Sequence, residues 1–419
     1  MTDTRNVLSL IVAVMILQIA GGLTSVLTPL GLEAMDVDET LIGLVAALHA
    51  AGFMAGAWVS PRVLAAVGNI RMFAAAAAIT AAGFLSLSLL LEPPFWALVR
   101  LLQGASFAFM FTSIESWLGE AVPARSRGNV MGIYHTTGKV SLMLGPFFVA
   151  GLSPLDSRAY IWAGFFLALA IVPICMTRLK EPPPPDRKAM PLSRLHAIAP
   201  AAVIGVASAG FVNTGTLAML PIYFDKFDLG GGGTTAAAIG AAAAWTGGLI
   251  LQWPAGRASD FVDRRLIVAA LCGISGVSAL LIALLGPAIG ETGVIALLAI
   301  WGAGALCFYG ICVSHAIDRT PPGQVAQVMS GLLFVWAAGS IAGPLASGLV
   351  MTLAGGFGLF GLAGVCLSAA ALYMLARSRM RQAPEPLPPG ERALILTSPL
   401  ASPQILPPDH PPHESGAGD

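Results

Sequence analysis

Charged residues are scarce in this sequence. Asp, Glu, Lys and Arg together make up 11% of its 419 residues, whereas soluble domains carry about 25%. Hydrophobic residues make up 56%. A water-soluble fold could not cover that much apolar surface with so few charges, which excludes an ordinary soluble protein. The solvent must be lipid, because twelve spans of about 20 residues need roughly 240 apolar positions, and the composition supplies about that many.

Other features are missing as well. There is no excess of positive charge, with 22 basic and 22 acidic residues, so we expect no nucleic acid partner. The five cysteines lie in apolar runs without any CxxC pair, which predicts neither a disulfide framework nor a zinc site. No phosphate-binding loop of the form GxxxxGK(S/T) is present. We therefore expect no cofactor and no bound metal.

Twelve apolar runs are long enough to cross a bilayer. They fall near 7–30, 40–61, 71–91, 95–120, 128–152 and 159–178, and again near 198–223, 235–259, 266–288, 292–317, 324–352 and 355–376. Between the two sets stand four consecutive prolines, which cannot continue a helix. The predicted domains are an N-terminal six-helix half (1–178), a cytoplasmic linker (179–197), a C-terminal six-helix half (198–377) and a disordered, proline-rich tail (378–419).

The distribution of basic residues predicts the orientation. With both termini in the cytoplasm, 18 of the 22 Lys and Arg residues face the cytoplasm. Arg158 and Lys226 face the outside, and Arg100 and Lys139 lie within helices. Cytoplasmic loops of membrane proteins carry such an excess of bases. We expect a multi-pass protein of the inner (plasma) membrane with both termini cytoplasmic.

The two sets of runs repeat one another. Met131 and Gly145-Pro146 in the fifth run match Met329 and Gly343-Pro344 in the eleventh, at a constant offset of 198 residues. Parallel repeats of six helices, related by an axis along the membrane normal, are one transporter architecture.

A charged motif follows the eighth run. The segment from Gln252 to Arg265 contains Gly256, Asp260, Arg264 and Arg265. Glycine lets two helices approach closely, and an aspartate beside arginines can form a charged latch that holds one conformational state closed. The alternative is a charged loop that only sets the topology.

This motif resembles the cytoplasmic loop signature of the major facilitator superfamily, G-x-x-x-D-(R/x)-x-x-(R/K)-(R/K). The first-half copy keeps Gly56 but has Ser60-Pro61 where the aspartate belongs. More narrowly, the sequence is similar to the YcaD-like branch of that superfamily. The segments that carry this similarity are Arg100-Leu-Leu-Gln103-Gly104, Ile114-Glu115-Ser116-Trp117-Leu118, Arg127-Gly128, and Ser314-His315 through Asp318-Arg319 to Gly343-Pro344. The resemblance implies an all-α integral membrane protein with twelve transmembrane helices in two six-helix repeats, a permease without a named substrate.

Ionisable residues inside the predicted spans are candidates for the proton and substrate pathway, because charge within a bilayer is costly and usually functional. Glu115 lies in the fourth span, and His135 and Lys139 lie one turn apart in the fifth. Their similar depth predicts that Glu115 pairs with His135 or Lys139. The alternative is a structural polar clamp between the two helices.

Three further residues join these candidates. His315 stands at the place of Glu115 in the second repeat, with Asp318 near the cytoplasmic end, and histidine carries protons near neutral pH. Arg100 resembles the span-four arginine that is associated with proton coupling in the superfamily. Structural roles for His315 and Arg100 are the alternatives.

We interpret the sequence as a secondary active transporter that moves a small organic solute by alternating access, with protons as the coupling ion. Gly145-Pro146 and Gly339-x-x-x-Gly343-Pro344 resemble an exporter motif and favour export; uptake is the alternative. Other classes remain open: an intramembrane serine protease using Ser275, within Gly273-Ile-Ser275-Gly276, and a non-transporting membrane sensor. The expected partners are a small-molecule substrate, protons and the lipid bilayer, and we expect a monomer.

Overall fold

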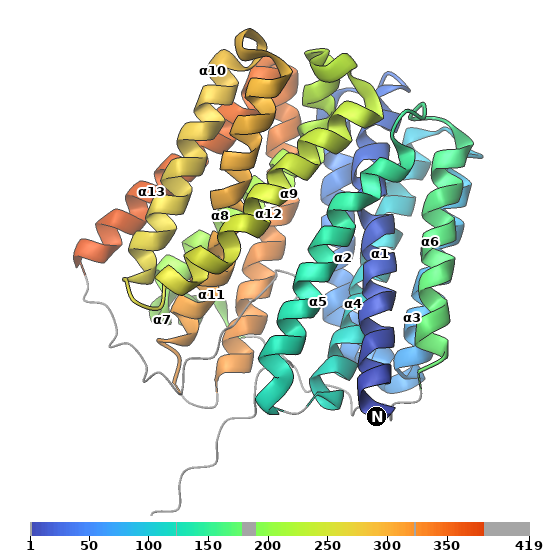
Figure 1. The fold of residues 1–419 in the computed structure, drawn as a ribbon, viewed down its shortest axis with the longest axis horizontal. Coiled ribbons are helices and arrows are strands. Elements are labelled where there is room, and N and C mark those ends of the chain that lie inside the picture. The colour runs from blue at the N-terminus through green and yellow to red at the C-terminus, as the bar shows by residue number, and fades with distance from the viewer. Residues whose placement is uncertain (1, 123, 178–189, 322–323, 381–419) are drawn as a thin grey trace, which may run out of the picture.

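A computed structural model describes residues 2–122, 124–177, 190–321 and 324–380, and within these ranges it is helical, without a strand (Figure 1). The first half comprises α1 (Thr2–Glu33), α2 (Glu39–Val67), α3 (Asn69–Leu87), α4 (Pro93–Ala121), α5 (Ala124–Leu144), the 3₁₀ turn η1 (Gly145–Val149) and α6 (Ser157–Cys175). The second comprises α8 (Pro200–Lys226), η2 (Leu229–Gly231), α9 (Gly233–Ala258), α10 (Arg264–Ala305), α11 (Phe308–Ile317), α12 (Val325–Ala354) and α13 (Gly356–Met380). A helix pairs its backbone polar groups internally, which is required in the bilayer core because no water is present to hydrogen-bond them.

Ten described segments are long and apolar enough to cross a membrane. One of them, Arg264–Ile317, is a 54-residue stretch, and α5 is not among the ten. Within α10 the backbone is non-helical at Gly290, with φ 67° and ψ −177°. Ser275 Oγ donates to Trp301 O at 2.7 Å and Ser278 Oγ to Leu297 O at 2.6 Å, so the chain reverses and α10 is a hairpin of two antiparallel arms, with its turn at the top of Figure 1. The predicted run 292–317 is thereby divided between the second arm and α11.

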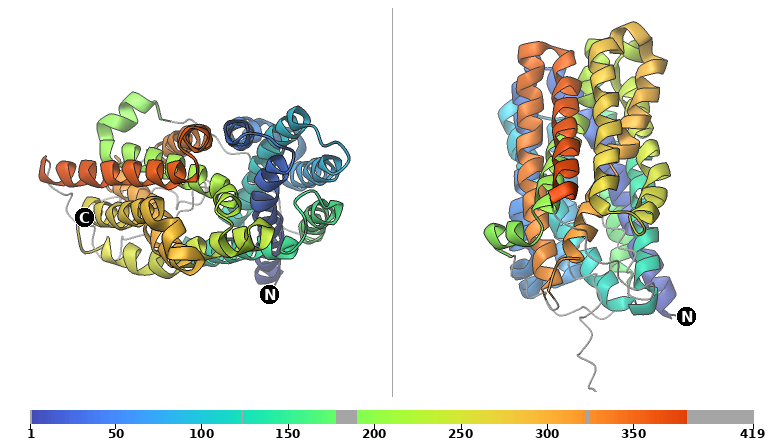
Figure 2. Two further views of the ribbon diagram at one scale, coloured as in Figure 1. Left: turned by 90° about the horizontal axis from the view of Figure 1, so that it is seen from above. Right: turned by 90° about the vertical axis from the view of Figure 1, so that its left-hand side faces the viewer.

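The two halves stand side by side, and the view from above separates them into two groups of helices (Figure 2). Within each half, glycine permits backbone contact between helices. A Cβ on Gly52 of α2 would collide with Leu101 O of α4, and a Cβ on Gly343 of α12 would collide with Phe211 O of α8. Such small-residue contacts replace the hydrophobic driving force that lipid does not provide.

The linker and tail differ in detail from the sequence prediction. The described part of the linker contains α7 (Leu192–Ile198), and Met190 N donates to Gln327 O. Helix α13 continues to Met380, beyond the predicted boundary at 377, and carries Arg377 and Arg379 in its last turn, where cations favour the helix dipole. The rest of the predicted linker (178–189) and the tail from 381 onward lie outside the described residues.

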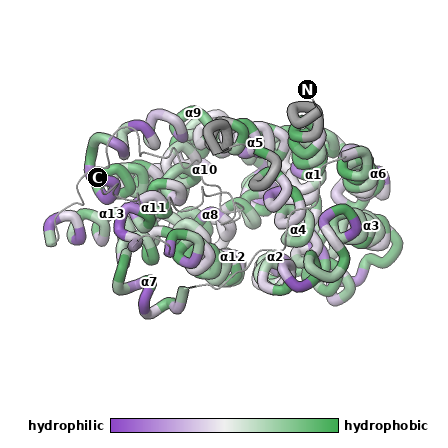
Figure 3. Tube along the Cα trace, turned by 90° about the horizontal axis from the view of Figure 1, so that it is seen from below, coloured by the Kyte–Doolittle hydropathy of each residue, from purple (hydrophilic) through white to green (hydrophobic). Residues whose placement is uncertain are grey.

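The two ends of the bundle differ in charge. We call the end that holds the N-terminus the basic end; it carries Arg62, Arg71, Arg194, Arg257, Arg264, Arg265, Arg319, Arg377 and Arg379. The opposite, acidic end carries Glu33, Asp36, Asp38, Glu39, Glu92, Asp156, Asp225, Asp228 and Glu291. Figure 3, which looks at the basic end, shows hydrophilic residues at helix ends there, for example at α7 and α11. The apolar bodies of the helices lie between two polar faces.

Ser275 tests the hairpin and the protease alternative together. Its hydroxyl is fully buried and bonded to the backbone of the other α10 arm, so we expect Ser275→Ala to lower the free energy of unfolding by about 1 kcal/mol and to leave function intact. Thermal unfolding of the purified variant measures the first effect. Ser88→Ala is the control, because the Ser88 hydroxyl donates to Leu85 O, three residues earlier at the end of α3. Loss of activity in well-folded Ser275→Ala protein would contradict the structural role.

Candidate functional site

A cavity of about 420 Å³ lies between the two halves, within the usual size range of small-molecule sites. Its wall comes from α1, α2, α4 and α5 of the first half and from α8, α9, α10, α11 and α12 of the second. It extends from Ile42 and Pro344 to Gly256 and Asp260 at the basic end. A ligand in it would therefore touch both halves.

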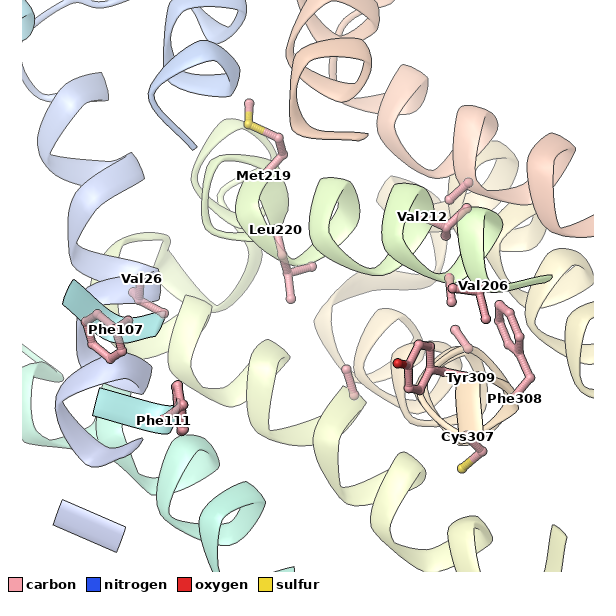
Figure 4. Packing of buried hydrophobic residues seen from close by; sticks show 14 of the residues in the cluster. Val26, Phe107, Phe111, Val206, Val212, Met219, Leu220, Cys307, Phe308 and Tyr309 are labelled. Carbon is pink, nitrogen blue, oxygen red and sulfur yellow. The ribbon is translucent and has the colours of Figure 1, made fainter. Parts of the chain in front are cut away.

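The wall is mainly apolar and aromatic. Its aromatic members are Phe53, Phe107, Phe111, Trp245, Tyr309 and Trp336. Figure 4 shows Phe107 and Phe111 of the first half across from Cys307 and Tyr309 of the second. Polar groups are spread thinly among them, including Gln18, Thr24, Asn213 and Gln252. Such a surface accepts an apolar body and fixes its orientation by a few polar contacts.

Lys139 of α5 lines the cavity and reaches across to the second half. Its Nζ donates to Gln252 Oε1 of α9 at 2.5 Å. Depth along the membrane predicted that Glu115 pairs with His135 or Lys139, but the ammonium group of Lys139 bonds to the other half instead. Gln252 was part of the motif that the sequence singled out, yet its role as the partner of Lys139 had no signal in the sequence.

Glu115 of α4 is almost fully buried, with 1% of its surface exposed, and it does not belong to the cavity wall. Tyr134 Oη donates to Glu115 Oε1 at 3.4 Å, and the ring of His135 packs edge-on against that of Tyr134, with centroids 4.9 Å apart. Helices α4 and α5 thus bring together Glu115, Tyr134 and His135. Tyr134 was not predicted, because only the acidic and basic side chains within the spans were taken as candidates.

Arg100 lies in the wall of the cavity, near the acidic end of α4. Its Nη1 donates to Gln103 Oε1 at 3.2 Å, and His49 Nδ1 lies 3.2 Å from Arg100 O. The Nε of Arg100 is buried without a hydrogen-bond partner in the described part of the chain. The site therefore holds a second cation with unused donor capacity.

At the basic end, Arg264 of α10 joins two acids. Its Nε donates to Asp318 Oδ2 at 2.6 Å, its Nη1 donates to Ser259 Oγ at 3.0 Å, and Asp260 Oδ1 lies 3.7 Å away. His315, one turn before Asp318, is buried in α11. These residues all belong to the second half, so in this structure they brace α10 against α11 and do not join the halves.

The side chain of Arg265 has different partners from that of Arg264. Its guanidinium pairs with Asp263 at 2.6 Å and donates to Arg377 O of α13 at 2.8 Å. Burial opposes ionisation of Asp263, but the hydrogen bonds from Arg265 outweigh it and hold the pKa of that carboxyl below its usual range. Asp263 therefore caps the start of α10, where its carboxylate also accepts from Arg265 N, and Arg265 ties α10 to α13.

The close packing expected at Gly256 is absent, because a Cβ there would meet no described atom within 4 Å. Gly256 borders the mouth of the cavity instead. The repeat-related Gly56 does pack tightly, with a Cβ position only 2.6 Å from Ala105 O. Gly256 therefore makes no close helix contact with the described residues in this conformation, and its role in a cytoplasmic gate stays a prediction.

The acidic end is closed by contacts between the halves. Glu39 of α2 forms a salt bridge with Lys226 of α8 and accepts a hydrogen bond from Thr352 Oγ1 of α12 at 3.0 Å. A Cβ on Gly43 would collide with Pro344 O, and one on Gly348 with Glu39 O. Backbone therefore lies directly on backbone here, and nothing in the sequence marked Glu39 and Lys226 as partners.

Comparison with known proteins identifies the architecture. The profile described as Major Facilitator Superfamily matches residues 10–331 and, in a second match, 206–407. An uncharacterized MFS-type transporter of Enterobacter sp. (strain 638), Ent638_1421, is 25% identical over 356 residues, covering 84% of this chain and 90% of that protein. The uncharacterized MFS-type transporter YcaD of Escherichia coli O7:K1 is 25% identical over 357 residues, with the same coverage.

Solved structures share the fold. The nucleoside transporter NupG aligns with a TM-score of 0.70 at 12% identity, covering 90% of this chain and 100% of that chain. A bacterial homolog of the human lysosomal transporter Spinster, in an inward-facing and occupied conformation, aligns with a TM-score of 0.70 at 16% identity, covering 91% and 97%. The family match over most of the sequence, two helical halves and a cavity between them lead to one conclusion: the chain belongs to the Major Facilitator Superfamily and is a membrane transporter, not an enzyme.

Proposed function

We propose that this transporter moves a small organic solute by alternating access and couples the movement to protons. The observation that carries the proposal is the cavity itself, closed at the acidic end by contacts between the halves and reaching the charged residues of the basic end. Rocking of one half against the other would break the closure at the acidic end and form one at the basic end.

The proposed location is the inner membrane, with the basic end and both termini in the cytoplasm. The support is the uneven distribution of arginine and lysine between the two ends. The structure then corresponds to a state open to the cytoplasm. Export is the proposed direction, favoured by the resemblance of Gly145-Pro146 and Gly343-Pro344 to an exporter motif; uptake is the alternative.

Glu115 is the proposed coupling residue. A proton drives a conformational change only if the two states bind it with different affinity. Glu115 is buried beside Tyr134 and His135 in this conformation, so rocking of the halves would change its access to water. A structural clamp between α4 and α5 is the alternative, in which the same hydrogen bond serves only to hold the helices together.

Orientation is tested by reporter fusions. A reporter active only outside the cytoplasm should be silent after Met380, at the basic end of α13. The same reporter inserted at Glu92, between α3 and α4 at the acidic end, should be active and serves as the matched insertion. Activity after Met380 would overturn the proposed orientation.

The closure of the acidic end is tested through its salt bridge. Lys226→Gln removes the inter-half pair with Glu39 and should increase outside accessibility of the cavity about two- to fivefold, since a partly exposed pair contributes up to about 1 kcal/mol. The measurement is labelling, by an impermeant maleimide from each side, of a cysteine introduced at the wall residue Thr28 in a cysteine-free background.

Arg158→Gln is the matched control for Lys226→Gln. It removes an exposed pair with Asp156 at the same end, but within one half, so accessibility should stay unchanged. Equal labelling in wild type and Lys226→Gln would mean that the salt bridge does not hold the acidic end closed.

Coupling is tested by Glu115→Gln, which keeps the size and hydrogen-bonding capacity of the side chain. We expect loss of pH-driven flux in proteoliposomes while counterflow of substrate continues, because only the titrating group is removed. Glu92→Gln, at the exposed start of the same helix, should leave both activities intact. Wild-type pH-driven flux in Glu115→Gln would eliminate this residue and move attention to His315 and Asp318, and loss of folded protein would favour the clamp.

A further inference from the structure

The membrane-buried part of the cavity is positively charged. Among the described residues, four formally charged side chains line the cavity: Arg100, Lys139, Asp260 and Arg264. Asp260 and Arg264 lie together at the mouth and share the cluster with Asp318. This leaves Arg100 and Lys139 in the interior, where the described wall contributes no carboxylate.

The partners of these two cations are neutral. Lys139 Nζ donates to the side-chain amide oxygen of Gln252, and Arg100 Nη1 donates to that of Gln103. No described carboxylate forms a salt bridge with either of them. An amide oxygen satisfies one donor but does not neutralise the charge, and an uncompensated cation inside a membrane protein is costly.

Both cations have donors left for a ligand. An ammonium group has three donors, and one of those on Lys139 is taken by Gln252. Arg100 is 9% exposed, lines the cavity, and its Nε has no hydrogen-bond partner in the described residues. Asn213, also in the wall, bonds through Nδ2 to Ala305 O, while its Oδ1 has no described partner. The unused groups thus include two cationic donors and one neutral acceptor.

The rest of the wall selects the body of the ligand. Trp245 and Trp336 come from the second half and Phe53, Phe107 and Phe111 from the first. Aromatic side chains offer large contact area and favourable ring packing. A ligand that satisfies this wall has an apolar, preferably aromatic, body together with an anionic group.

We propose that the substrate is an amphipathic organic anion, whose carboxylate or sulfonate pairs with Lys139 while its apolar body lies against the aromatic wall. The anion would supply the negative charge that the wall lacks. Because Lys139 belongs to the first half and its partner Gln252 to the second, an anion bound to the unused donors of Lys139 would lie where the two halves meet. The proposal rests on the proposed transport function and names its substrate class.

Ligand binding to the purified protein in nanodiscs tests the proposed substrate class without a proton gradient. The probes share one aromatic body: 2-naphthoate and 2-naphthalenesulfonate are anionic, 2-naphthamide is neutral and 2-naphthylmethylammonium is cationic. Isothermal titration, corrected with empty nanodiscs, should show the anions binding at least about tenfold more tightly than the amide. The ammonium should bind most weakly, because Arg100 and Lys139 repel it.

Variants of Lys139 assign the preference to this residue. Lys139→Gln should raise the Kd of 2-naphthoate at least about tenfold and leave that of 2-naphthamide within about twofold. Lys139→Arg keeps the charge and should restore the affinity to within about threefold of wild type. Arg158→Gln, which removes an exposed cation far from the wall, should change neither affinity.

Three results would overturn the proposal: tightest binding of the ammonium, unchanged 2-naphthoate affinity in folded Lys139→Gln, or no binding of either anion. If Lys139→Gln does not fold, the relative affinities of the wild-type protein for the anionic, neutral and cationic probes decide whether the proposal stands. Anion binding without flux in proteoliposomes would sink the proposed transport cycle but leave the ligand class standing. Flux of a neutral or cationic solute without anion binding would support the proposed transport cycle and overturn the ligand class.

Discussion

Backbone contact between α2 and α12 at the acidic end is the constraint on which the rest of the arrangement depends. Gly43 lies against Pro344 O and Gly348 against Glu39 O, so any larger side chain would separate the two halves there. Since lipid gives helices no hydrophobic reason to associate, contact at this distance supplies the van der Waals energy that does. The halves are pinned at one end, and the cavity extends from this contact to the other end.

The salt bridges at the two ends of the bundle differ in whether they join the halves. At the acidic end, where the halves touch, Glu39 and Lys226 come from different halves and neutralise one another. At the basic end the pairs of Arg264 and Arg265 remain inside the second half. Among the described residues, the salt bridge between the halves lies at the acidic end, and the inter-half bond of a cation within the cavity is that of Lys139 with Gln252.

The sequence predicted the helices well and their neighbours poorly. Hydropathy located most of the helices to within a few residues, because lipid selects long apolar runs and prolines exclude helix. The exceptions are the run 292–317, which is divided between two helices, and α5, which is not among the ten described segments apolar enough to cross a membrane. The reversal at Gly290 was also anticipated as a break between two runs. By contrast, the partners Gln252 for Lys139 and Tyr134 for Glu115 depend on the rotation of each helix about its axis and on which helices are neighbours. Depth along the membrane, which is all that sequence position supplies, does not determine either.

Gly56 and Gly256 are related by the repeat but differ in how closely they pack in this conformation. They hold equivalent places in the two halves, yet Gly56 packs against Ala105 of its own half and Gly256 faces the cavity mouth. A glycine without neighbours carries a conformational cost and, in this state, no packing benefit. In an alternating cycle the contact surrendered at the acidic end must be replaced at the basic end, or the second state would lack comparable stability. Gly256, next to Asp260 and Arg264 at the mouth of the cavity, has the small size and the position that such a replacement contact requires.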